Sequence, residues 1–573
     1  MLEKERWVVT AAWPYINSVP HLGTILHLLG ADIMTRFLKM LGEDVISVSG
    51  SDEHGTPIEV EARRKSIDPR RLTDEAHSYV AEILRRWRIE LDNYSRTESS
   101  AHKQFVKDFM SRLERKGYVF TQRVVLPYCE RDKIFLPDRF VEGKCPRCGY
   151  PNARGDQCEN CGSLLDPLDL ISPRCAICGS RPVLKETTHW FFDLRKLEEP
   201  VRRWLEENKN LWDNVRNYSL NWIKEGLKPR SVTRDNAWGI EAPFLGAEGK
   251  TIYVWFEALL GYLSASKEIL EKRGRSFDDF WYNKNTKTVY FIGKDNIPFH
   301  AVILPAMLIA SDDRYPLPWI ISSTEYLLYE GEKFSKSRRI GLWADEALYI
   351  VEDPDYWRFA LVRMRPEERD TNFSWKEFFR IVNSELNDDI GNFVHRVLSF
   401  IERHFDSRIP MPGGFDDIDI EVIESVKLSY GSYIDRMLET RIKQASEYIL
   451  DIARKGNQYI NRRAPWEEIK RDQRRAGTTM YIAANIVAIL ALSLYPITPN
   501  AAQRIWSMIG FSEPIEMARY NRGNIFIVES GRSIKGIELP FKKLPQDFLS
   551  RISEMIIEAR RRAQEERPTY LRF

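Results

Sequence analysis

The residues best suited to bind a metal are the cysteines, most of which stand in pairs. Cys145 and Cys148, followed by Cys158 and Cys161, form the pattern C-x2-C-x9-C-x2-C, with a glycine directly after each pair. Each pair is typical of a knuckle that aims two thiolates at one metal, and the glycine permits its tight turn. Free thiols would be unusual in so polar a segment, because unligated cysteine is normally buried. The spacing therefore predicts one structural Zn²⁺ site, and the seven cysteines favour metal ligation in a reducing compartment over disulfides.

A second group of residues is suited to bind phosphate. Residues 7–10 are mostly β-branched and apolar, prolines interrupt the chain at positions 14 and 20, and a Leu-rich helix is expected from His21 onward. The unpaired N–H groups and the dipole of a helix N-terminus favour an anion. The His21 imidazole can donate to a phosphoryl oxygen, and Gly23 lets a nucleotide approach the backbone. On its own, such a fragment is more often a turn before a buried helix.

Two lysines lie about three hundred positions further on, in the small-residue loop of residues 331–337. The sequence Lys333-Phe-Ser-Lys336-Ser, together with His21-Leu-Gly-Thr24, resembles the paired signatures of class I aminoacyl-tRNA synthetases, and the pair is far more specific than either piece. The resemblance runs from about residue 7 into the helical C-terminal third. Four further stretches resemble those of methionyl-tRNA synthetases: residues 11–15, 50–57, 253–258 and 291–295.

The resemblance implies amino-acid activation, in which a carboxylate attacks the α-phosphorus of ATP and pyrophosphate leaves. This reaction needs positioning and charge neutralisation more than covalent work. Thr24 stands where the family usually has a second histidine, and a hydroxyl can donate a hydrogen bond but cannot carry charge. The implied catalytic residues are His21, Lys333 and Lys336. The implied ATP-binding residues are His21, Gly23, Thr24, Gly293, Asp295 and Lys336, with Mg²⁺ accompanying the nucleotide.

The resemblance also implies a methionine pocket. Asp52 would pair with the α-ammonium group, since a charge-assisted hydrogen bond is stronger than a neutral one. Apolar aromatic side chains suit a thioether, although an ordinary aromatic core is the alternative explanation for them. Some members of the resembled family carry other residues at the positions of Leu259 and Asn296. The resemblance therefore does not decide which residues form the rim of the pocket. The implied methionine-binding residues are Ala12, Trp13, Tyr15, Asp52, Trp255, Ala258, Tyr262 and His300.

A second metal site is one of two interpretations of the remaining cysteines. Cys175 and Cys178 form one more knuckle, and Cys129 has no partner at the same spacing. Archaeal-type members of the resembled family that carry two zinc ions have ligands in these regions, and Asp132 stands here in place of a cysteine. A carboxylate can ligate zinc. The four residues therefore form either a second zinc site or a metal-free hairpin.

In the helical third, Ala464-Pro-Trp466 resembles the place where the family stacks a tryptophan on the first anticodon base. Asn387, Asn392 and Arg396 lie on a preceding expected helix and could read base edges. A buried polar seam explains the two asparagines equally well. The implied partner is tRNA(Met), both initiator and elongator.

Composition limits the other possibilities. The 573 residues suffice for three or four domains, and 85 Lys and Arg against 83 Asp and Glu place any RNA contact in local patches rather than in a basic tail. The longest apolar run, residues 486–495, is far below the roughly 20 residues that span a bilayer, and the N-terminus has no signal or transit pattern. We expect a cytoplasmic monomer without a membrane partner, and a separate tRNA-binding protein stays open.

The elements that position these residues follow an α/β pattern. A short apolar strand at 45–48 and amphipathic helices at 73–88 and 101–116 predict a parallel sheet; the pattern stops near 118 and returns with strands at 251–255 and 288–292. We therefore predict a Rossmann-type parallel-sheet core split by a zinc-knuckle insert and followed by an α-helical bundle, and the resemblance implies that this is an α-helical anticodon-binding bundle. Long helices are expected at 376–404, 419–455, 466–473, 480–495 and 548–566. The expected domains are 1–117 (first half of the core), 118–224 (insert), 225–324 (second half), 325–380 (stem-contact region with the lysine loop) and 381–573 (helical domain).

The function that the resemblance implies is the activation of L-methionine with ATP and its transfer to the 3′ end of tRNA(Met). One alternative is another class I synthetase for an aliphatic or sulfur-containing amino acid. The other is a non-catalytic RNA-binding protein with zinc knuckles, which the coexistence of two distant phosphate motifs with Asp52 disfavours.

Overall fold

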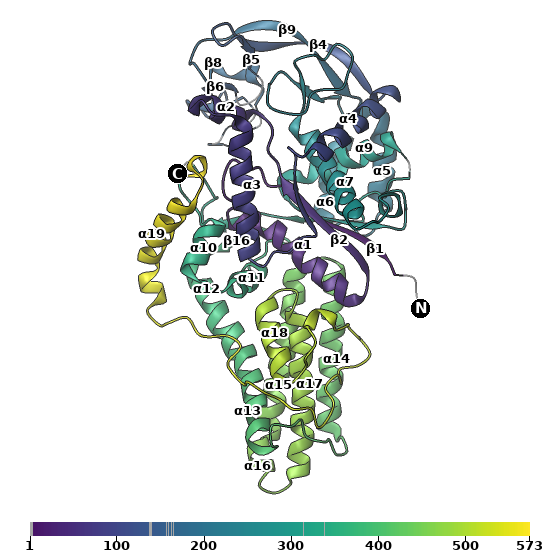
Figure 1. The fold of residues 1–573 in the computed structure, drawn as a ribbon, viewed down its shortest axis with the longest axis vertical. Helices are drawn as coiled ribbons and strands as arrows, with labels where there is room; N and C mark the ends of the chain where they lie inside the picture. The colour runs from purple at the N-terminus through teal and green to yellow at the C-terminus, as the bar shows by residue number, and fades with distance from the viewer. Residues whose placement is uncertain are drawn as a thin grey trace.

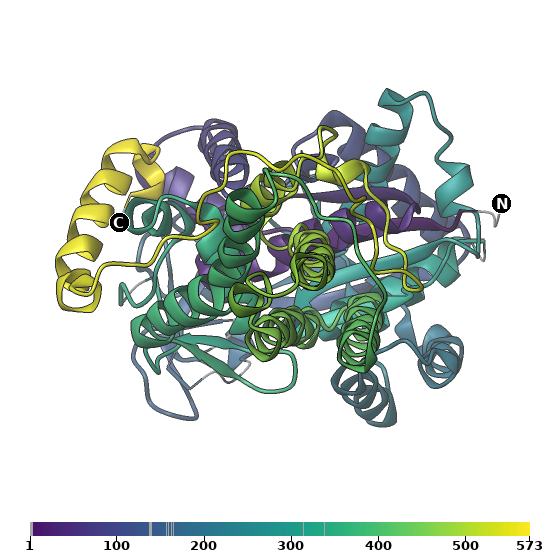
Figure 2. The same ribbon diagram turned by 90° about the horizontal axis from the view of Figure 1, so that it is seen from below.

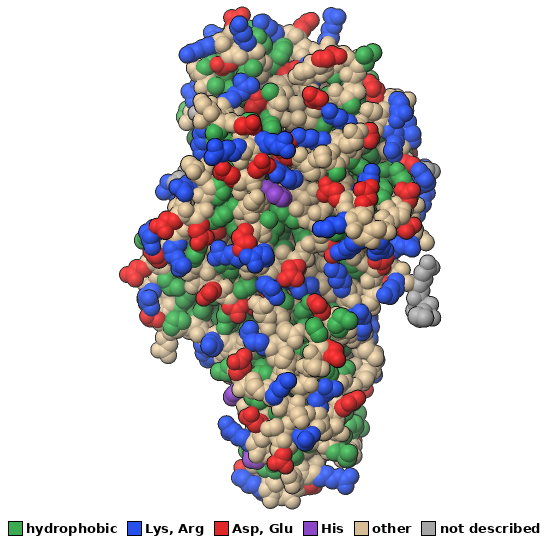
Figure 3. Space-filling view, in the orientation of Figure 1, with side chains coloured by type: hydrophobic (Ala, Val, Ile, Leu, Met, Phe, Trp, Pro, Cys, Tyr) green, Lys and Arg blue, Asp and Glu red, His purple; other side chains and the backbone are tan. Residues whose placement is uncertain are grey.

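The molecule is elongated, with an α/β part at one end and a bundle of long helices at the other (Figure 1). This computed structural model describes residues 4–136, 140–155, 158, 160–161, 163, 165–312, 314–336 and 338–572. Lys, Arg, Asp and Glu side chains are intermixed over the face seen in Figure 3, as the near-zero net charge leads one to expect.

A five-stranded parallel sheet forms the centre of the α/β part. Its strand order is β14-β13-β1-β2-β3. Strands that precede the insert in the sequence and strands that follow it therefore pair in one sheet. The prediction of a parallel-sheet core split by an insert is confirmed. The strands are β1 (Arg6–Ala11), β2 (Asp44–Ser51), β3 (Asn93–Arg96), β13 (Lys287–Gly293) and β14 (Ile320–Thr324).

Both faces of the sheet are covered by helices. The alternation of side chains along β1 sends Val9 into one core, with helix α1 (Leu22–Leu41), and Val8 into the other. The second core contains α4 (Ser100–Arg115), α7 (Val254–Lys272) and α9 (Leu304–Ser311). Burial on both faces is what a parallel sheet of this kind requires.

The insert is built on a long antiparallel ribbon, β4 (Val119–Cys129) paired with β9 (Val183–Phe192). A small sheet carries the cysteine-rich lobe at the far end of this ribbon (Figure 1). Because β10 (Arg230–Ser231) pairs with β9, the insert extends beyond the expected boundary at residue 224. The other elements of the insert are β5 (Ile134–Phe135), β6 (Val141–Lys144), β7 (Ala153–Arg154), β8 (Ile171–Cys175), α5 (Glu198–Glu207) and α6 (Asp213–Lys224).

The prediction of a strand at residues 251–255 was wrong. Only β12 (Thr251–Ile252) is extended, and it pairs with β11 (Thr233–Arg234) outside the parallel sheet. Helix α7 begins at Val254, so Trp255 lies in its first turn. The β-branched and aromatic composition of this stretch favoured a strand, but packing of α7 on the sheet decided its conformation.

The bundle contains one more turn than the sequence indicated. The single helix expected at 419–455 is two antiparallel helices, α14 (Asp417–Leu438) and α15 (Ile442–Arg463). Thr440 makes the turn with a φ of 60°, without the glycine or proline that usually signals such a break. The remaining bundle helices are α12 (Trp375–Arg380), which continues through a π-helical stretch (Ile381–Gly391) into α13 (Asn392–His404), then α16 (Pro465–Glu468), α17 (Gln473–Leu494) and α18 (Pro499–Met508).

Helix α17 is the central helix of the bundle. By length and composition alone it could cross a membrane, but 94% of its apolar window is buried inside the protein. Figure 2 shows several of the bundle helices nearly end-on, packed side by side. The apolar character of α17 is therefore that of a core helix.

The C-terminal segment returns to the α/β part. Helix α19 (Phe548–Glu566) stands to one side of the bundle and packs against α10 (Ala344–Ile350) and α12 (Figures 1 and 2). Beyond it, the buried Arg567 guanidinium pairs with Asp345 at 2.7 Å. The expected helical domain 381–573 therefore ends against the α/β part, and its first boundary falls inside a continuous helix.

Candidate functional site

The two phosphate motifs, far apart in sequence, lie side by side. The backbone N–H of Leu22 donates to Leu342 O at 3.1 Å, and that of Ala344 donates to Pro20 O at 2.9 Å. The Phe334 ring stacks on the His21 imidazole, with 4.3 Å between ring centroids. The structure thus brings together the residues that the paired signatures singled out.

His21 caps the N-terminus of α1 with its own side chain. Its Nδ1 accepts a hydrogen bond from Thr24 N at 3.3 Å, which leaves Nε2 to carry the proton. Burial lowers the pKa of His21 to about 4, so the imidazole is neutral near pH 7. A β-carbon at Gly23 would lie only 3.0 Å from the ring, so glycine leaves the space that the imidazole needs. Thr24 therefore orients His21, its Oγ1 lying 3.4 Å from Nε2.

The lysine loop closes over the start of α1. Lys336 Nζ donates to Asn17 O at 2.6 Å, and Asn17 lies in the connection between β1 and α1. Burial lowers the pKa of Lys336, and the nearby Glu61 carboxylate partly opposes this shift. Lys333 points elsewhere, with Nζ 4.6 Å from the centre of the Tyr326 ring.

A cavity of about 440 Å³, the central pocket, opens at the carboxyl ends of the strands. In open α/β sheets, ligands bind at this edge. Thr24 and Asn17 also line it, so the pocket adjoins the phosphate motifs. The structure brings together here all eight residues implied for methionine: Ala12, Trp13, Tyr15, Asp52, Trp255, Ala258, Tyr262 and His300, with Leu259 and Asn296 beside them.

Asp52 presents an unsatisfied carboxylate to this pocket. The side chain is only 8% exposed, and its Oδ1 has no hydrogen-bond partner among the described residues. Burial raises the pKa of Asp52 well above its usual value, and the Glu257 carboxylate raises it further. An unpaired buried carboxylate is costly and is expected to find a cationic partner.

A hydrogen-bond chain fixes the far wall of the pocket. His300 Nδ1 donates to Asn296 O at 2.9 Å, so its Nε2 accepts from the Tyr262 hydroxyl at 2.7 Å. Burial lowers the pKa of His300 to about 4 and raises that of Tyr262, so both groups are neutral near pH 7. This wall offers a ligand an aromatic surface without charge.

The two tryptophans have different roles in the lining. Trp13 is buried, and its ring lies so close to Gly50 and Gly261 that a β-carbon at either position would clash at 2.8 Å or less. Trp255 is 39% exposed and stacks on Phe299 with 4.3 Å between ring centroids. Trp13 therefore forms a fixed inner wall, and Trp255 lies at the entrance.

The residues implied for adenosine lie at the end of β13. Gly293 ends this strand, and a β-carbon there would come within 3.3 Å of the His27 ring. Asp295 follows in a 3₁₀ turn, and its Oδ1 accepts from the Tyr326 hydroxyl at 2.7 Å. The Asp295 side chain is exposed and accessible to a ligand.

Each predicted set of metal ligands converges in space. The ligand atoms of Cys145, Cys148, Cys158 and Cys161 all lie within 4.8 Å of one another, and two of their Sγ–Sγ distances are 3.6 and 3.9 Å. Thiolates about 2.3 Å from a tetrahedral zinc ion would be about 3.8 Å apart. The second cluster, Cys129, Asp132, Cys175 and Cys178, meets the same 4.8 Å limit, so both clusters could hold a metal ion.

Asp132 is an integral part of the second cluster. Its Oδ2 lies 3.2 Å from Cys129 Sγ and 3.1 Å from Cys175 Sγ. The carboxylate thus occupies the position that a fourth thiolate would take. The chemistry of the donor set suits zinc, which accepts carboxylate oxygen beside thiolate sulfur.

A groove of about 430 Å³, the distal groove, lies at the end of the bundle remote from the sheet (Figure 1). Trp466 lines it with 41% of the side chain exposed, and the Arg396 guanidinium lies 5.7 Å from the centre of its ring. Asn392 is one turn before Arg396 on α13 and bonds to Asp388 at 3.1 Å. The exposed ring of Trp466 beside a guanidinium group is accessible to a ligand.

Asn387 does not belong to this group. Its side chain is 4% exposed, and its Nδ2 donates to Phe541 O at 2.6 Å. The amide holds the C-terminal segment against the bundle and has no access to the distal groove. Of the two explanations open for Asn387, the buried polar seam is the one that fits.

Comparison with known proteins identifies the family. A family model described as class I tRNA synthetases (M) matches residues 7–398, and one described as the anticodon binding domain of methionyl tRNA ligase matches residues 409–556. The chain belongs to the methionyl-tRNA synthetase family. Members are ligases that join methionine to tRNA, and the chain is an enzyme of this kind.

Relatives of similar length support this membership. A methionine–tRNA ligase of Aeropyrum pernix is 55% identical, covering 99% of this chain and 100% of the relative, and one of Ignicoccus hospitalis is 54% identical over 98% and 100%. The crystal structure of Mycobacterium tuberculosis methionyl-tRNA synthetase bound by methionyl-adenylate superposes with a TM-score of 0.77. It covers 94% of this chain and 100% of that one at 22% identity, a likeness of fold.

Several lining residues of this synthetase were not predicted as site residues. His54 lies in the same motif as Asp52, and its Nδ1 pairs with Glu257 Oε1 at 2.8 Å. His27 lies six residues after His21 and bonds to Thr324 Oγ1 at 3.0 Å. Their place in or near a recognised motif could have signalled both. Arg234 lies in a stretch without periodicity, and no signal in the sequence indicated it.

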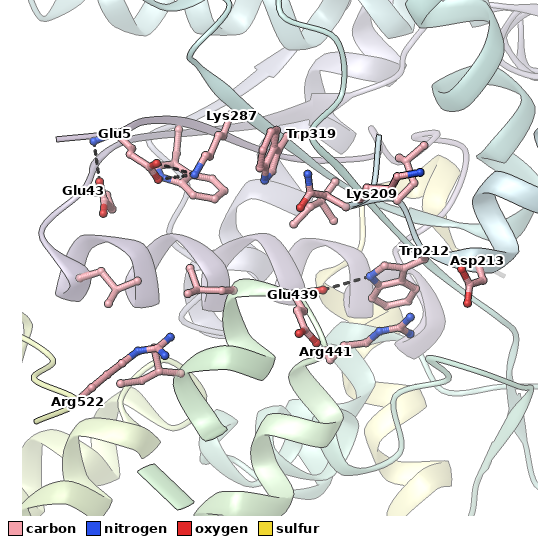
Figure 4. A pocket seen from close by; sticks show the side chains of 17 residues that line it. Glu5, Glu43, Lys209, Trp212, Asp213, Lys287, Trp319, Glu439, Arg441 and Arg522 are labelled. Carbon is pink, nitrogen blue, oxygen red and sulfur yellow. Dashed lines mark hydrogen bonds and ion pairs between the residues drawn. The ribbon is translucent and has the colours of Figure 1, made fainter. Parts of the chain in front are cut away.

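A second large cavity lies where the sheet, the insert and the helical bundle of the synthetase meet. This junction cleft, of about 620 Å³, lies at the amino ends of the strands, opposite the central pocket (Figure 4). Trp212, directly before α6, donates from Nε1 to Glu439 O at 3.2 Å, and the Arg441 guanidinium lies 3.7 Å from the centre of the Trp212 ring. Lys287 pairs with Glu5 at 2.6 Å. Here the insert contacts the α14–α15 turn beside the sheet, so the cleft is a domain junction.

Proposed function

We propose that the central pocket binds L-methionine and that the adjoining phosphate motifs bind ATP for its activation to methionyl-adenylate. The observation that carries this proposal is the buried Asp52 carboxylate, whose Oδ1 lacks a hydrogen-bond partner among the described residues, in a pocket whose inner wall is aromatic and uncharged. An α-ammonium group would satisfy this atom, and a thioether suits the Trp13 and Tyr262 rings.

In the proposed reaction, the methionine carboxylate forms a bond to the α-phosphorus while the bond to pyrophosphate breaks. The His21 Nε2–H donates to a phosphate oxygen, and the positive end of the α1 dipole favours the phosphate charge. Lys336 stabilises the charge that develops on the leaving group, Lys333 adds positive charge from its place over the Tyr326 ring, and Mg²⁺ enters with ATP. Gly293 and Asp295 hold the adenosine, Asp295 at the ribose hydroxyls.

The test of this function is methionine-dependent exchange of pyrophosphate into ATP, measured with a panel of amino acids. We expect exchange with methionine and little with leucine, isoleucine or cysteine. Preferred turnover of another aliphatic or sulfur-containing amino acid would reassign the pocket. Failure with every amino acid would favour the non-catalytic RNA-binding alternative.

In the second step, the 3′ end of tRNA(Met), initiator or elongator, attacks the methionyl carbonyl and AMP leaves. We propose that Trp466, Asn392 and Arg396 bind the anticodon at the distal groove. The separation of the groove from the central pocket along the molecule supports this, because a tRNA presents its anticodon and acceptor end far apart. We further propose that the enzyme is a cytoplasmic monomer, and a separate tRNA-binding protein remains a candidate partner.

We propose that both cysteine clusters hold structural zinc. The distances within each cluster support this, as does the complete set of four protein ligands, which is typical of a structural rather than a catalytic zinc site. Elemental analysis of reduced protein should give two zinc ions per chain, and Asp132→Ala should lower the content to one. One zinc ion in the unaltered protein would leave the second cluster as a metal-free hairpin.

A further inference from the structure

The distal groove has a second aromatic surface besides Trp466. Phe400 and His404 line the same groove, and their ring centroids are 4.4 Å apart with an angle of 39° between the planes. Phe400 packs in part against the bundle core, whereas His404 is exposed. The sites described above give this pair of side chains no role.

The spacing along α13 separates the two aromatic surfaces. Arg396, Phe400 and His404 follow one another at intervals of four residues, so they share a face of the helix and are about 6 Å apart along its axis. Arg396 lies over Trp466, so Phe400 begins about one turn further along the groove. Two bases in a continuous stack are only roughly 3.4 Å apart, which is less than this step. A stacked pair therefore cannot contact both aromatic surfaces, whereas two bases that are splayed apart can.

The charge of the groove suits a nucleic-acid backbone. No Asp or Glu lines it among the described residues, whereas Arg396 and Arg403 do. Arg396 is held by the amide oxygens of Asn457 and Asn461, so no carboxylate neutralises it. Arg403 is exposed and has no ion-pair partner in the described part of the chain. Uncompensated cations beside aromatic rings are the combination that single-stranded RNA binds.

From these observations we propose that Phe400 and His404 form a platform for a second anticodon base, next to the one bound at Trp466. Arg403 contacts the phosphate that joins them. The proposal rests on the assignment of the distal groove to the anticodon. It makes the groove a reader of two neighbouring positions, each through its own ring surface.

The test compares Phe400→Leu and His404→Ala with Phe405→Leu. Phe405 is an aromatic neighbour, 6.3 Å from Phe400 between ring centroids, but it does not line the groove. Aminoacylation is measured with tRNA(Met) transcripts carrying the CAU anticodon and with single substitutions at each anticodon position. Pyrophosphate exchange without tRNA reports the active site, and thermal melting reports the fold.

We expect Phe400→Leu and His404→Ala to lower kcat/KM for the CAU transcript by about 5- to 150-fold, mainly through KM, with exchange unchanged. They should reduce discrimination at an anticodon position different from the one affected by Trp466→Ala. The second platform is overturned if kcat/KM falls no more than it does in Phe405→Leu. It is also overturned if discrimination is lost at the same anticodon position as in Trp466→Ala. Should Trp466→Ala also leave tRNA kinetics unchanged, the anticodon assignment of the whole groove fails.

Discussion

The central pocket and the distal groove have similar volumes, about 440 and 430 Å³, but opposite character. In the pocket, Tyr262 is 2% exposed and its hydroxyl is already bonded to His300. In the groove, Trp466 is 41% exposed and the cation beside it faces solvent. The pocket is shaped by the packing of the protein core before any ligand arrives, whereas the groove presents open ring faces and positive charge.

This difference indicates how each region selects its ligand. In the pocket, a buried carboxylate oxygen without a hydrogen-bond partner among the described residues penalises any ligand that brings no ammonium group, because the buried charge then stays unpaired. In the groove, Trp466, Arg396 and His404 are exposed to water, so selection depends on the shape and stacking of RNA bases. Substitutions in the pocket should therefore have larger effects than substitutions in the groove.

The largest effect is expected from Asp52→Ala. Loss of the carboxylate removes the counter-charge of the α-ammonium group, which at 2 to 5 kcal/mol corresponds to a roughly 30- to 5,000-fold fall in kcat/KM for methionine. ATP affinity should change little. Steady-state exchange kinetics and equilibrium binding of ATP measure the two, with the exposed Glu241→Ala as control. An equal loss of ATP affinity would mean that Asp52 supports the nucleotide site or the fold.

Lys336→Ala should have the next largest effect. The lysine is proposed to act on charge that develops in the transition state, so the rate of adenylate formation should fall by about 100- to 1,000-fold with methionine affinity nearly unchanged. Pre-steady-state kinetics separate these quantities. Arg338→Ala, in the same loop and paired with Glu332 at the surface, is the matched control. A normal rate with weaker methionine binding would remove Lys336 from its role.

The distinction between pocket and groove also marks what the sequence could predict. His21 and Lys336 were identifiable because the chemistry of each resides in a short motif, and the structure places their motifs together. The bond between Tyr262 and His300 was not, because it depends on the relative placement of α7 and the π-helical stretch Phe299–Ile303. Candidate residues within a short motif could therefore be named from the sequence, whereas contacts that depend on packing could not.

The failures had local physical causes. The turn at Thr440 uses a threonine in the left-handed region, where the sequence offers no glycine or proline to indicate a break. Residues 251–255 have strand-like composition but enter α7. Asn387 lies on the helix that leads to the distal groove, yet its side chain faces Phe541. In each case tertiary contacts overrode the local preference.

Trp466→Ala tests the groove side of the comparison. Loss of one base stack, at 1 to 3 kcal/mol, should lower aminoacylation of tRNA with a CAU anticodon by roughly 5- to 150-fold. Pyrophosphate exchange without tRNA should stay the same, since the groove and the pocket lie in different parts of the molecule. Loss of both activities together would instead identify Trp466 as a residue on which the bundle depends.

The smallest effect is expected on stability, from Asp52→Asn. Burial raises the pKa of Asp52 in the folded protein above that of the unfolded chain. The folded state therefore holds this proton more tightly, and the stability it contributes is present below the unfolded pKa of about 3.9 and lost as pH rises through the folded pKa. Near pH 7.5, without substrate, the neutral amide should raise the melting temperature by about 1 °C. The difference should vanish toward pH 4.

Calorimetry with and without methionine supplies the control for this last comparison. Methionine should stabilise the unaltered enzyme, because its ammonium pairs with the carboxylate, and should stabilise Asp52→Asn much less. A variant less stable than the unaltered enzyme at pH 7.5 would contradict the prediction, since it would mean that the carboxylate already has a favourable partner within the protein. The pocket would then be no more preorganised for a cation than the open groove, and the contrast between the two regions would lose its electrostatic basis.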